Sequence, residues 1–349
     1  MPSTANIRWF ADISLADRRT VGGKGGSLGE LTRAKVAVPP GFVVTTLSFQ
    51  RVLAELEKEN PIRSRVETLS IHDLKGIRLL SQEIRPRLQN VPLPKDVCAD
   101  LVDAHAELCG PDLNCPLAVR SSATVEDSEE ASFAGLQDTY LWVKGAEAIL
   151  NYLRACWASL YSVPSISYRR KDGIPEDRVA IAVVVQRMVD ARSAGVMFTR
   201  SPLTGDRSVI TIEASWGLGS AVVSGEVTPD RFVIGKITSQ ISVREISDKR
   251  WQHVSAESGG IKHIETPKEL RQAPSISDEE LKALAEIGLK VERHYGRSQD
   301  IEWAIDPSGE ILLLQSRPET VWSAADKAPV AKPAENPLLH VMTIFGGRH

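Results

Sequence analysis

The chain has 349 residues, a formal net charge of −3, 42% hydrophobic residues and 25% charged residues. These values are ordinary for a globular protein, and a chain beyond about 300 residues usually divides into more than one lobe. A charge this close to neutral argues against nucleic acid as the main partner. No apolar run approaches the roughly 20 residues of a membrane-spanning helix, so we expect a soluble protein.

The four cysteines, Cys98, Cys109, Cys115 and Cys156, show no C-x-x-C pairing. The first residues, MPSTANIRWFADISLADRR, contain no apolar segment of the secretory kind. We therefore expect reduced thiols and a cytoplasmic location.

The first part of the chain predicts a glycine-rich turn, a strand and a long helical region. Residues 20–35, TVGGKGGSLGELTRAK, predict a turn followed by a short helix that begins with a capping box of Ser27 and Glu30. VAVPPGFVVTT, at 36–46, predicts a proline break and a short strand. Apolar residues at three- and four-residue spacing predict helices over 47–108.

The remaining elements mix strands and helices without a strict βαβ rhythm, which predicts an α+β fold. The strand at 178–189 is apolar and β-branched enough to lie at the centre of a sheet. Ser277 and Glu280 predict a second capping box. Strands are expected at 113–120, 194–199, 208–215 and 231–237, helices at 145–162 and 277–296, a hairpin at 300–318, and a linker after Trp322.

Two segments have the composition of a phosphate site. The glycines of 22–26 would let the backbone approach an anion, and Lys24 adds a point charge, although an ordinary flexible turn reads the same way. Arg120, at a strand end with Ser121 and Ser122, offers paired donors that match phosphate oxygens. The alternative is a surface arginine that pairs with the acids of 126–130.

The last hairpin predicts a metal site. If its turn is Asp306–Gly309, Ile305 pairs with Glu310 and Glu302 lies opposite Leu313. One face then carries Asp300, Glu302, Gln315 and Arg317, and the core face carries Ile301, Trp303, Ile305, Leu312 and Leu314. Carboxylate and amide oxygens side by side suit Mg²⁺, although a merely wet strand face remains the alternative.

Two further segments give weaker signals. Gln186 and Met188, at the end of the central strand, could border a nucleobase, although Met188 by spacing alone reads as a core residue. WGLG, at 216–219, is a tight turn that either borders a nucleotide or is a plain loop.

Six segments, taken in order, resemble one family: VGGKGGSLGEL, VPPGFVVTT, AVRSSATVEDSEEASFAGLQDTYL, VVQRMVDARSAGVMFTRSPLTGD, ASWGLGSAVVSGEVTPD and DIEWAIDPSGEILLLQSRPET. The chain resembles the ATP-binding domain of phosphoenolpyruvate synthase, and pyruvate phosphate dikinase and rifampin phosphotransferase have similar domains. The resemblance extends from about residue 7 to residue 322. It implies a two-lobed ATP-grasp fold that binds ATP and Mg²⁺ between its lobes, one lobe at 1–190 and the other at 191–322, with a linker and tail at 323–349.

The resemblance also assigns roles to single residues. Two departures from the family pattern are Leu136, in the phosphate loop, and Ser220, after the WGLG turn, where relatives commonly have glutamate. The implied phosphate-binding residues are Lys24, Arg120, Ser121, Gly135, Thr139 and Arg317, the adenine-side residues are Gln186 and Met188, and the metal ligands are Glu302 and Gln315.

The fused enzymes of this family carry a catalytic histidine in a T-S/C-H context, and none of the seven histidines here has that context. The resemblance therefore implies that this chain performs the ATP half-reaction with a histidine-bearing swivelling-domain subunit on a separate chain, as in phenylphosphate synthase. Two alternatives stay open, namely an excised ATP domain of a larger enzyme and a non-catalytic ATP-sensing subunit.

Overall fold

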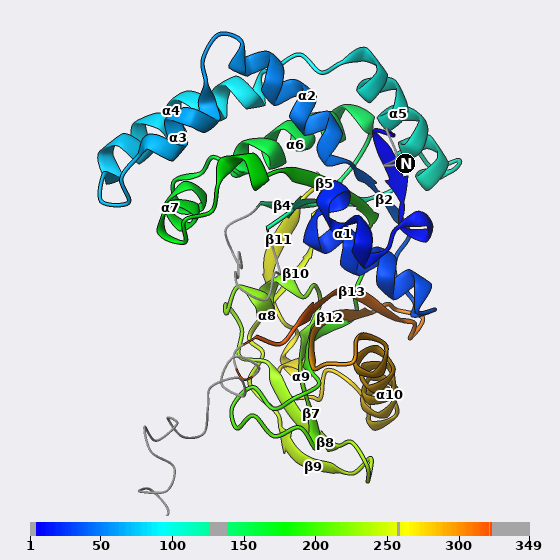
Figure 1. The fold of residues 1–349 in the computed structure, drawn as a ribbon. Coiled ribbons are helices and arrows are strands. Elements are labelled where there is room, and N and C mark those ends of the chain that lie inside the picture. The colour runs from blue at the N-terminus through cyan, green and yellow to red at the C-terminus, as the bar shows by residue number, and fades with distance from the viewer. Residues whose placement is uncertain (1–4, 126–137, 257–258, 321, 323–349) are drawn as a thin grey trace, which may run out of the picture.

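The computed structural model describes residues 5–125, 138–256, 259–320 and 322. Within these ranges the chain forms a five-stranded sheet, a six-stranded sheet and a separate two-stranded hairpin. Figure 1 shows the five-stranded sheet and its helices in the upper half of the molecule and the six-stranded sheet in the lower half. The mixture of helices and antiparallel strands confirms the α+β prediction.

The five-stranded sheet is antiparallel at every pairing. Its central strand is β5, whose residues are buried from Ile181 to Gln186, as the continuous apolar run predicts. In spatial order the strands are β1 (Ile7–Trp9), β2 (Gly41–Val44), β5 (Ile181–Arg187), β3 (Leu117–Ala123) and β4 (Thr139–Val143).

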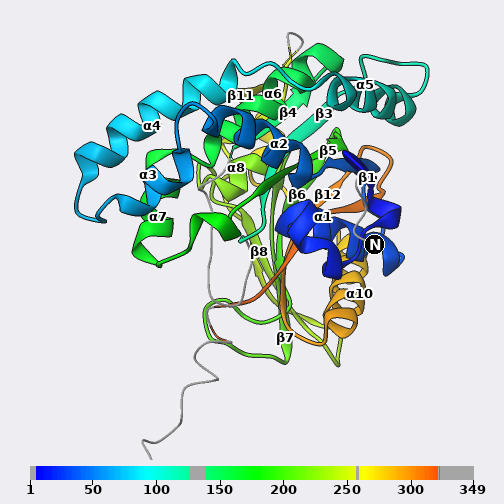
Figure 2. The ribbon, with the colours of Figure 1, turned by 45° about the horizontal axis from the view of Figure 1, so that its top comes forward.

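Helices cover one face of this sheet, as Figure 2 shows with the top of the molecule turned toward the viewer. The predicted helical region at 47–108 is confirmed, and it is divided into four helices. Phe49, Ile84 and Trp157 belong to the apolar core between these helices and the sheet. The helices are α2 (Thr46–Glu57), α3 (Ile62–Thr68), α4 (Leu74–Gln89), α5 (Lys95–Cys109), α6 (Ala146–Ser159) and α7 (Val163–Lys171), with short 3-10 turns η1 (Phe10–Asp12), η2 (Leu15–Asp17) and η3 (Glu176–Arg178).

Helix α1 (Arg18–Arg33) packs against a different set of apolar residues and corrects one prediction. Gly22 interrupts it with φ 72° and ψ −179°, so the regular helix begins directly after Gly22. The predicted capping box is wrong, because Ser27 lies inside the helix and donates to the Ser316 carbonyl of the last strand. Glu30 makes its hydrogen bonds outside its own helix.

The six-stranded sheet is also antiparallel at every pairing. Helix α10 (Asp278–Tyr295) packs on it, and the capping box of Ser277 and Glu280 is confirmed. In spatial order the strands are β13 (Ile311–Pro318), β12 (Gln299–Ile305), β6 (Ser193–Phe198), β7 (Val209–Trp216), β8 (Asp230–Gly235) and β9 (Ile241–Glu245). The shorter elements are α8 (Ser220–Val223), α9 (Lys268–Arg271) and the hairpin strands β10 (Trp251–Ser255) and β11 (Ile261–Glu265).

The cysteines differ from the expectation of four reduced thiols. A disulfide joins Cys109, the last residue of α5, to Cys115, with Cα atoms 5.6 Å apart. Cys98 and Cys156 are free thiols. Disulfides are rare in the cytoplasm, so the cytoplasmic location stays a prediction.

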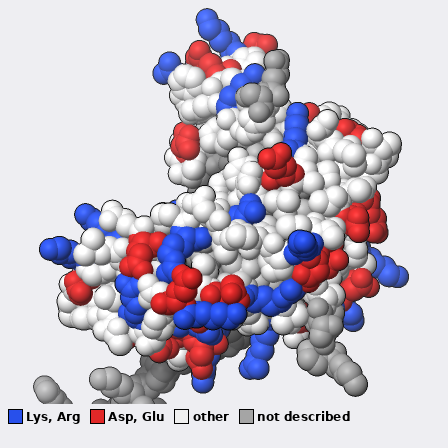
Figure 3. All heavy atoms as spheres, turned by 90° about the horizontal axis from the view of Figure 1, so that it is seen from above, with Lys and Arg blue, Asp and Glu red and all other residues white. Residues whose placement is uncertain are grey.

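The surface carries charges of both signs. Figure 3 views the molecule from above and shows lysine, arginine, aspartate and glutamate side chains interspersed on that face. Arg65 and Glu83 form an exposed ion pair with their charged atoms 2.7 Å apart. In the described part of the chain, no helix is both long and apolar enough to span a membrane.

Candidate functional site

Arg120 lies in the middle of β3, which corrects the prediction that it ends a strand. The strand continues through Ser121 and Ser122 to Ala123, and every residue in it is buried. The Arg120 residue is only 8% exposed, so its guanidinium needs partners within the protein. A surface arginine paired with a solvated acidic loop does not fit this burial.

The partners of Arg120 are the residues that the sequence predicted for the nucleotide and the metal. Its Nη2 atom donates to Oε1 of Gln315 at 2.6 Å and lies 3.4 Å from Oε2 of Glu302. Its Nη1 atom donates to the Leu314 carbonyl at 2.7 Å and lies 3.5 Å from Oε1 of Gln186. The structure therefore brings four predicted residues from β3, β5, β12 and β13 into one cluster, which we call the arginine cluster: Arg120, Gln186, Glu302 and Gln315.

The register of the last hairpin differs from the predicted register. Ile305 lies opposite Ile311, so the turn is one residue longer than predicted. The ladder is irregular between Glu302 and Trp303, where one extra residue of β13 places Gln315, instead of the predicted Leu313, opposite Glu302. The longer turn and the bulge each shift the register by one residue, and together they leave the faces of Gln315 and Arg317 unchanged. The predicted polar face of Asp300, Glu302, Gln315 and Arg317 is therefore confirmed.

The core face of the same hairpin was predicted incorrectly at three positions. Leu313 lies opposite Trp303 and both are fully buried in the core of the six-stranded sheet. Leu312 lies opposite Ala304, and with Leu314 it packs in a small separate cluster on the other face. The longer turn is the physical reason, because it shifts the register by one residue and exchanges the faces of Leu312 and Leu313, and the bulge at Leu314 shifts the register again before Gln315.

Glu302 and Gln315 have the donor set that fits Mg²⁺. Their side-chain oxygens converge on one cationic atom, Nη2 of Arg120, from opposite positions of neighbouring strands. A carboxylate and an amide oxygen are hard ligands of the type that Mg²⁺ takes together with phosphate oxygens and water. In this structure the Arg120 guanidinium contacts both of these oxygens.

Arg317 lies at the outer end of the same face. Its Nε atom is 3.5 Å from Oδ2 of Asp300, the residue directly opposite on β12, and its side chain is 41% exposed. The guanidinium is therefore accessible to a ligand beside the arginine cluster.

The glycine segment of α1 is held against β3 by one hydroxyl. Ser122 Oγ accepts from the Gly25 amide at 3.1 Å and donates to the Val21 carbonyl at 2.9 Å. Gly22 has positive φ, and a Cβ atom there would overlap the Ser122 carbonyl oxygen. Ser122 and Arg120 share one face of β3, so this contact brings the buried Lys24 segment to the arginine side of the strand.

The other predicted residues lie around this cluster rather than in it. Ser121 faces the opposite side of β3, and its hydroxyl donates to the Asp138 carbonyl at 2.8 Å. Thr139, the first residue of β4, lies opposite Arg120 and is exposed. Met188 follows β5 and is half-buried.

Gly135 and Leu136 fall outside the described residues, so the predicted phosphate-loop role of Gly135 stays a prediction. Ser220 begins α8 and binds His253, with Oγ 2.8 Å from Nδ1.

The sequence reasoning missed Glu213. It lies on β7 opposite Val196 of β6, which in turn lies opposite Glu302, so the two residues share one sheet face, with their backbones two strand spacings, about 10 Å, apart. Burial raises the pKa of Glu213, and the charge of Arg231 on β8 opposes this effect. A carboxylate in the apolar strand VITIEAS is the signal that could have found it.

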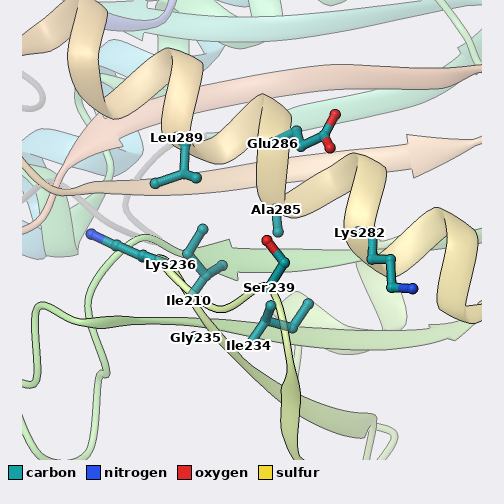
Figure 4. A pocket seen from close by; sticks show the side chains of 9 residues that line it. All are labelled: Ile210, Ile234, Gly235, Lys236, Ser239, Lys282, Ala285, Glu286 and Leu289. Atoms are coloured by element: carbon teal, nitrogen blue, oxygen red, sulfur yellow. The ribbon is translucent and has the colours of Figure 1, made fainter.

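A small cavity of about 60 Å³ lies between α10 and the six-stranded sheet. Figure 4 shows Lys236, Lys282 and Glu286 at its rim and Ile210 and Ile234 beneath. None of the described residues predicted for the phosphate site lines this cavity. It is too small for a nucleotide, so it is not the site.

The protein has an α+β fold in which a buried arginine, a buried amide and a partly exposed carboxylate lie together where two sheets meet. This arrangement suits an anionic ligand with a divalent cation. The chain belongs to the family described as "Pyruvate phosphate dikinase, AMP/ATP-binding domain", whose model matches residues 18–337.

Three relatives illustrate the similarity. The chain is 40% identical over 329 residues to the probable phosphoenolpyruvate synthase of Methanocaldococcus jannaschii, covering 93% of this chain and 28% of that protein. It is 41% identical over 332 residues to the probable phosphoenolpyruvate synthase of Methanothermobacter thermautotrophicus, covering 94% of this chain and 48% of that protein. It is 39% identical over 313 residues to the rifampicin phosphotransferase of a Streptomyces species, covering 88% of this chain and 35% of that protein. The chain thus spans less than half of the length of each of these relatives.

Among solved structures, the chain is similar to D-cycloserine synthetase DcsG, with 12% identity, a TM-score of 0.27 and coverage of 82% of this chain and 59% of that chain. Similarity at this level is too weak to support an inference about function or detailed fold.

Proposed function

We propose that this chain is an ATP-binding phosphotransferase component with a two-lobed ATP-grasp fold, formed by residues 1–190 and 191–322, with 323–349 as linker and tail. The observation that carries the proposal is the arginine cluster. Arg120, on β3 of the five-stranded sheet, contacts Glu302 and Gln315 on the last hairpin of the six-stranded sheet. One guanidinium and two hard oxygen ligands therefore lie together between the sheets.

Each residue of the site has a role in this proposal. Lys24, Arg120 and Arg317 neutralise the phosphate oxygens, with Thr139, Ser121 and Gly135 in the surrounding phosphate-binding segments. Gln186 and Met188 border the adenine. Glu302 and Gln315 hold Mg²⁺, which supplies charge neutralisation at the phosphates.

The proposed reaction moves the β- and γ-phosphoryl groups together to a histidine. A neutral imidazole nitrogen bonds to the β-phosphorus, the bond from that phosphorus to the oxygen shared with the α-phosphorus breaks, and AMP leaves with the oxygen. Hydrolysis of the pyrophosphoryl-histidine then gives phosphohistidine and phosphate. Catalysis by this chain is positioning and charge neutralisation, as in other phosphoryl transfers.

The histidine is proposed to lie on a separate swivelling-domain subunit, with phenol as the favoured final acceptor, as in phenylphosphate synthase. The relatives give a second arrangement, because they are more than twice as long as the matched region and are named as phosphoenolpyruvate synthases and a rifampicin phosphotransferase. In that arrangement the histidine lies elsewhere in one long polypeptide, and the acceptor is pyruvate or an antibiotic.

The test incubates the chain with Mg²⁺, ATP labelled at the β-phosphate, and the histidine-domain protein encoded beside its gene. AMP release together with acid-labile label on the added protein supports the divided enzyme. ATP binding without AMP contradicts phosphotransfer to that protein and favours an ATP-sensing subunit. The gene sequence beyond residue 349 distinguishes a natural subunit from an excised domain.

A further inference from the structure

The hairpin of β10 and β11 carries two histidines beside a glutamate that follows α8. We propose that Glu226, His253 and His263 form a binding site for a zinc-class transition metal ion. We call these three residues the histidine site. It is separate from the oxygen ligands Glu302 and Gln315, and it does not depend on the proposed phosphotransfer.

The three side chains converge without rearrangement of the backbone. His253 and His263 are directly opposite each other on β10 and β11, so they share one face of the hairpin, with ring centroids 4.9 Å apart. One ligand atom from each of the three residues lies within 4.8 Å of the other two.

The distances between the ligand atoms are close to those of a tetrahedral site. Oε2 of Glu226 is 3.1 Å from Nε2 of His253 and 3.9 Å from Nε2 of His263. Bonds of about 2.0–2.2 Å at tetrahedral angles place ligand atoms about 3.4 Å apart, which lies between these two distances. The two imidazole nitrogens lie within 4.8 Å of one another, so a metal ion draws them together by at most about 1.4 Å.

Ser220 orients the buried histidine for this role. His253 is 6% exposed, and Ser220 Oγ lies 2.8 Å from its Nδ1 atom. When Nε2 binds a metal, Nδ1 carries the proton and donates it to an oxygen, which is the usual support for a metal-binding imidazole. Ser220 is thus a positioning residue for His253.

The chemistry of the three ligands favours zinc over magnesium. Two imidazole nitrogens and one carboxylate suit Zn²⁺, and they suit Mg²⁺ poorly because it prefers oxygen ligands. The side chains of Glu226 and His263 are 47% and 45% exposed, so water completes the coordination. The alternative explanation of this cluster is an ion pair between Glu226 and a protonated histidine. Such an ion pair would involve only one of the two histidines.

The hairpin joins two parts of the molecule, which gives the site a structural effect. The His253 carbonyl accepts from the Leu218 amide at 2.9 Å, in the WGLG turn after β7. At the other end, the Gly260 amide reaches the Trp142 carbonyl of β4 at 3.5 Å, and Figure 1 shows the hairpin extending toward that strand. A bound metal would therefore fasten together the middle of the two strands of a hairpin that spans from one sheet toward the other.

The test measures Zn²⁺ binding to the full, chelator-stripped chain by competition with a chromophoric chelator in excess Mg²⁺. We expect a single tight site that His263→Asn and Glu226→Gln abolish, and that Ser220→Ala weakens about 10–100-fold. Both abolishing changes are at half-exposed side chains, and circular dichroism verifies their fold. His294→Gln is the matched control, because His294 also contacts a carboxylate, Glu30, at 2.6 Å, but among the described residues it belongs to no group of three such ligands.

Binding that persists in Glu302→Ala would separate this site from the proposed Mg²⁺ ligands. Co²⁺ added to the stripped chain should give the intense visible absorption of a low-coordinate site, and His263→Asn should remove it. The proposal is overturned if the parent chain competes with the chelator no better than His263→Asn, or if His294→Gln reduces binding as much as His263→Asn does.

Discussion

Nη2 of Arg120 donates to Oε1 of Gln315 at 2.6 Å and thereby joins β3 of the five-stranded sheet to β13 of the six-stranded sheet. These residues are 195 positions apart in the chain. A phosphate or a metal ion that enters here must compete for the same guanidinium and the same amide oxygen. Ligand binding is therefore coupled to the contact between the sheets.

Replacing Arg120 by lysine keeps the charge and removes the planar pair of donors. We expect ATP affinity to fall roughly 10–100-fold, because one charge-assisted hydrogen bond of about 1.5–3 kcal/mol is lost. Isothermal titration with a non-hydrolysable ATP analogue measures this change. Arg65→Lys, at an exposed ion pair on α3, is the control. Unchanged affinity in Arg120→Lys would remove Arg120 from the site.

Glu302→Ala and Arg317→Ala should each lower AMP formation about 100–1,000-fold, the usual effect of losing one group that stabilises developing charge. Both side chains are partly exposed, at 34% and 41%, so the melting temperature should stay close to that of the parent. The measurement is AMP yield with the histidine-bearing protein present. Glu310→Ala, beside the turn of the same hairpin, is the control, and a normal yield from either site variant contradicts the assigned roles.

Gly22→Ala should destabilise the chain by roughly 2–5 kcal/mol, since it combines a left-handed backbone with overlap against the Ser122 carbonyl. Gly296→Ala has nearly the same φ, 67°, but open space around its Cβ position, so it should lose only about 1–2 kcal/mol. Urea unfolding of both variants measures the difference. Equal losses would show that the contact with Ser122 does not hold the glycine segment.

Glu213→Gln should raise the melting temperature at neutral pH. Burial raises the folded-state pKa of Glu213 above 4.5, so the folded chain binds more protons than the unfolded chain in the window above that value. The contribution of Glu213 to the free energy of unfolding therefore falls as the pH rises above 4.5. Glutamine does not ionise, so the variant does not lose this stability. The gain should be no more than a few degrees, because the group is partly solvated.

The melting temperatures of Glu213→Gln and the parent should coincide below pH 4.5, where both side chains are neutral. A stabilised variant that also binds ATP more weakly would identify Glu213 as part of the site. A gain of the same size at every pH would instead point to a packing effect.

The sequence predicted the elements whose signals are local. The central strand β5 and the capping box of Ser277 and Glu280 follow from apolar runs and short spacings, and both are confirmed. The start of α1 was missed because its cap, Ser122, comes from a strand about 100 residues away. The disulfide of Cys109 and Cys115 was missed because pairing depends on how α5 meets β3.

The candidate site was predicted as residue types but not as contacts. Arg120, Glu302 and Gln315 were each singled out, yet their direct contact across two sheets depends on packing that no short spacing encodes. Glu213 was missed because a single acid in an apolar strand gains meaning only from its neighbours across the sheet.

The bulge in β13 frees one backbone carbonyl, which accepts a hydrogen bond from a guanidinium. Leu314 has no partner of its own across the ladder, and its carbonyl accepts from Arg120 at 2.7 Å. Deleting this residue would regularise the ladder and leave Leu313 and Gln315 on their present faces. We therefore expect a chain without this residue to keep the fold of the hairpin. The buried guanidinium of Arg120 would lose the carbonyl that accepts its hydrogen bond.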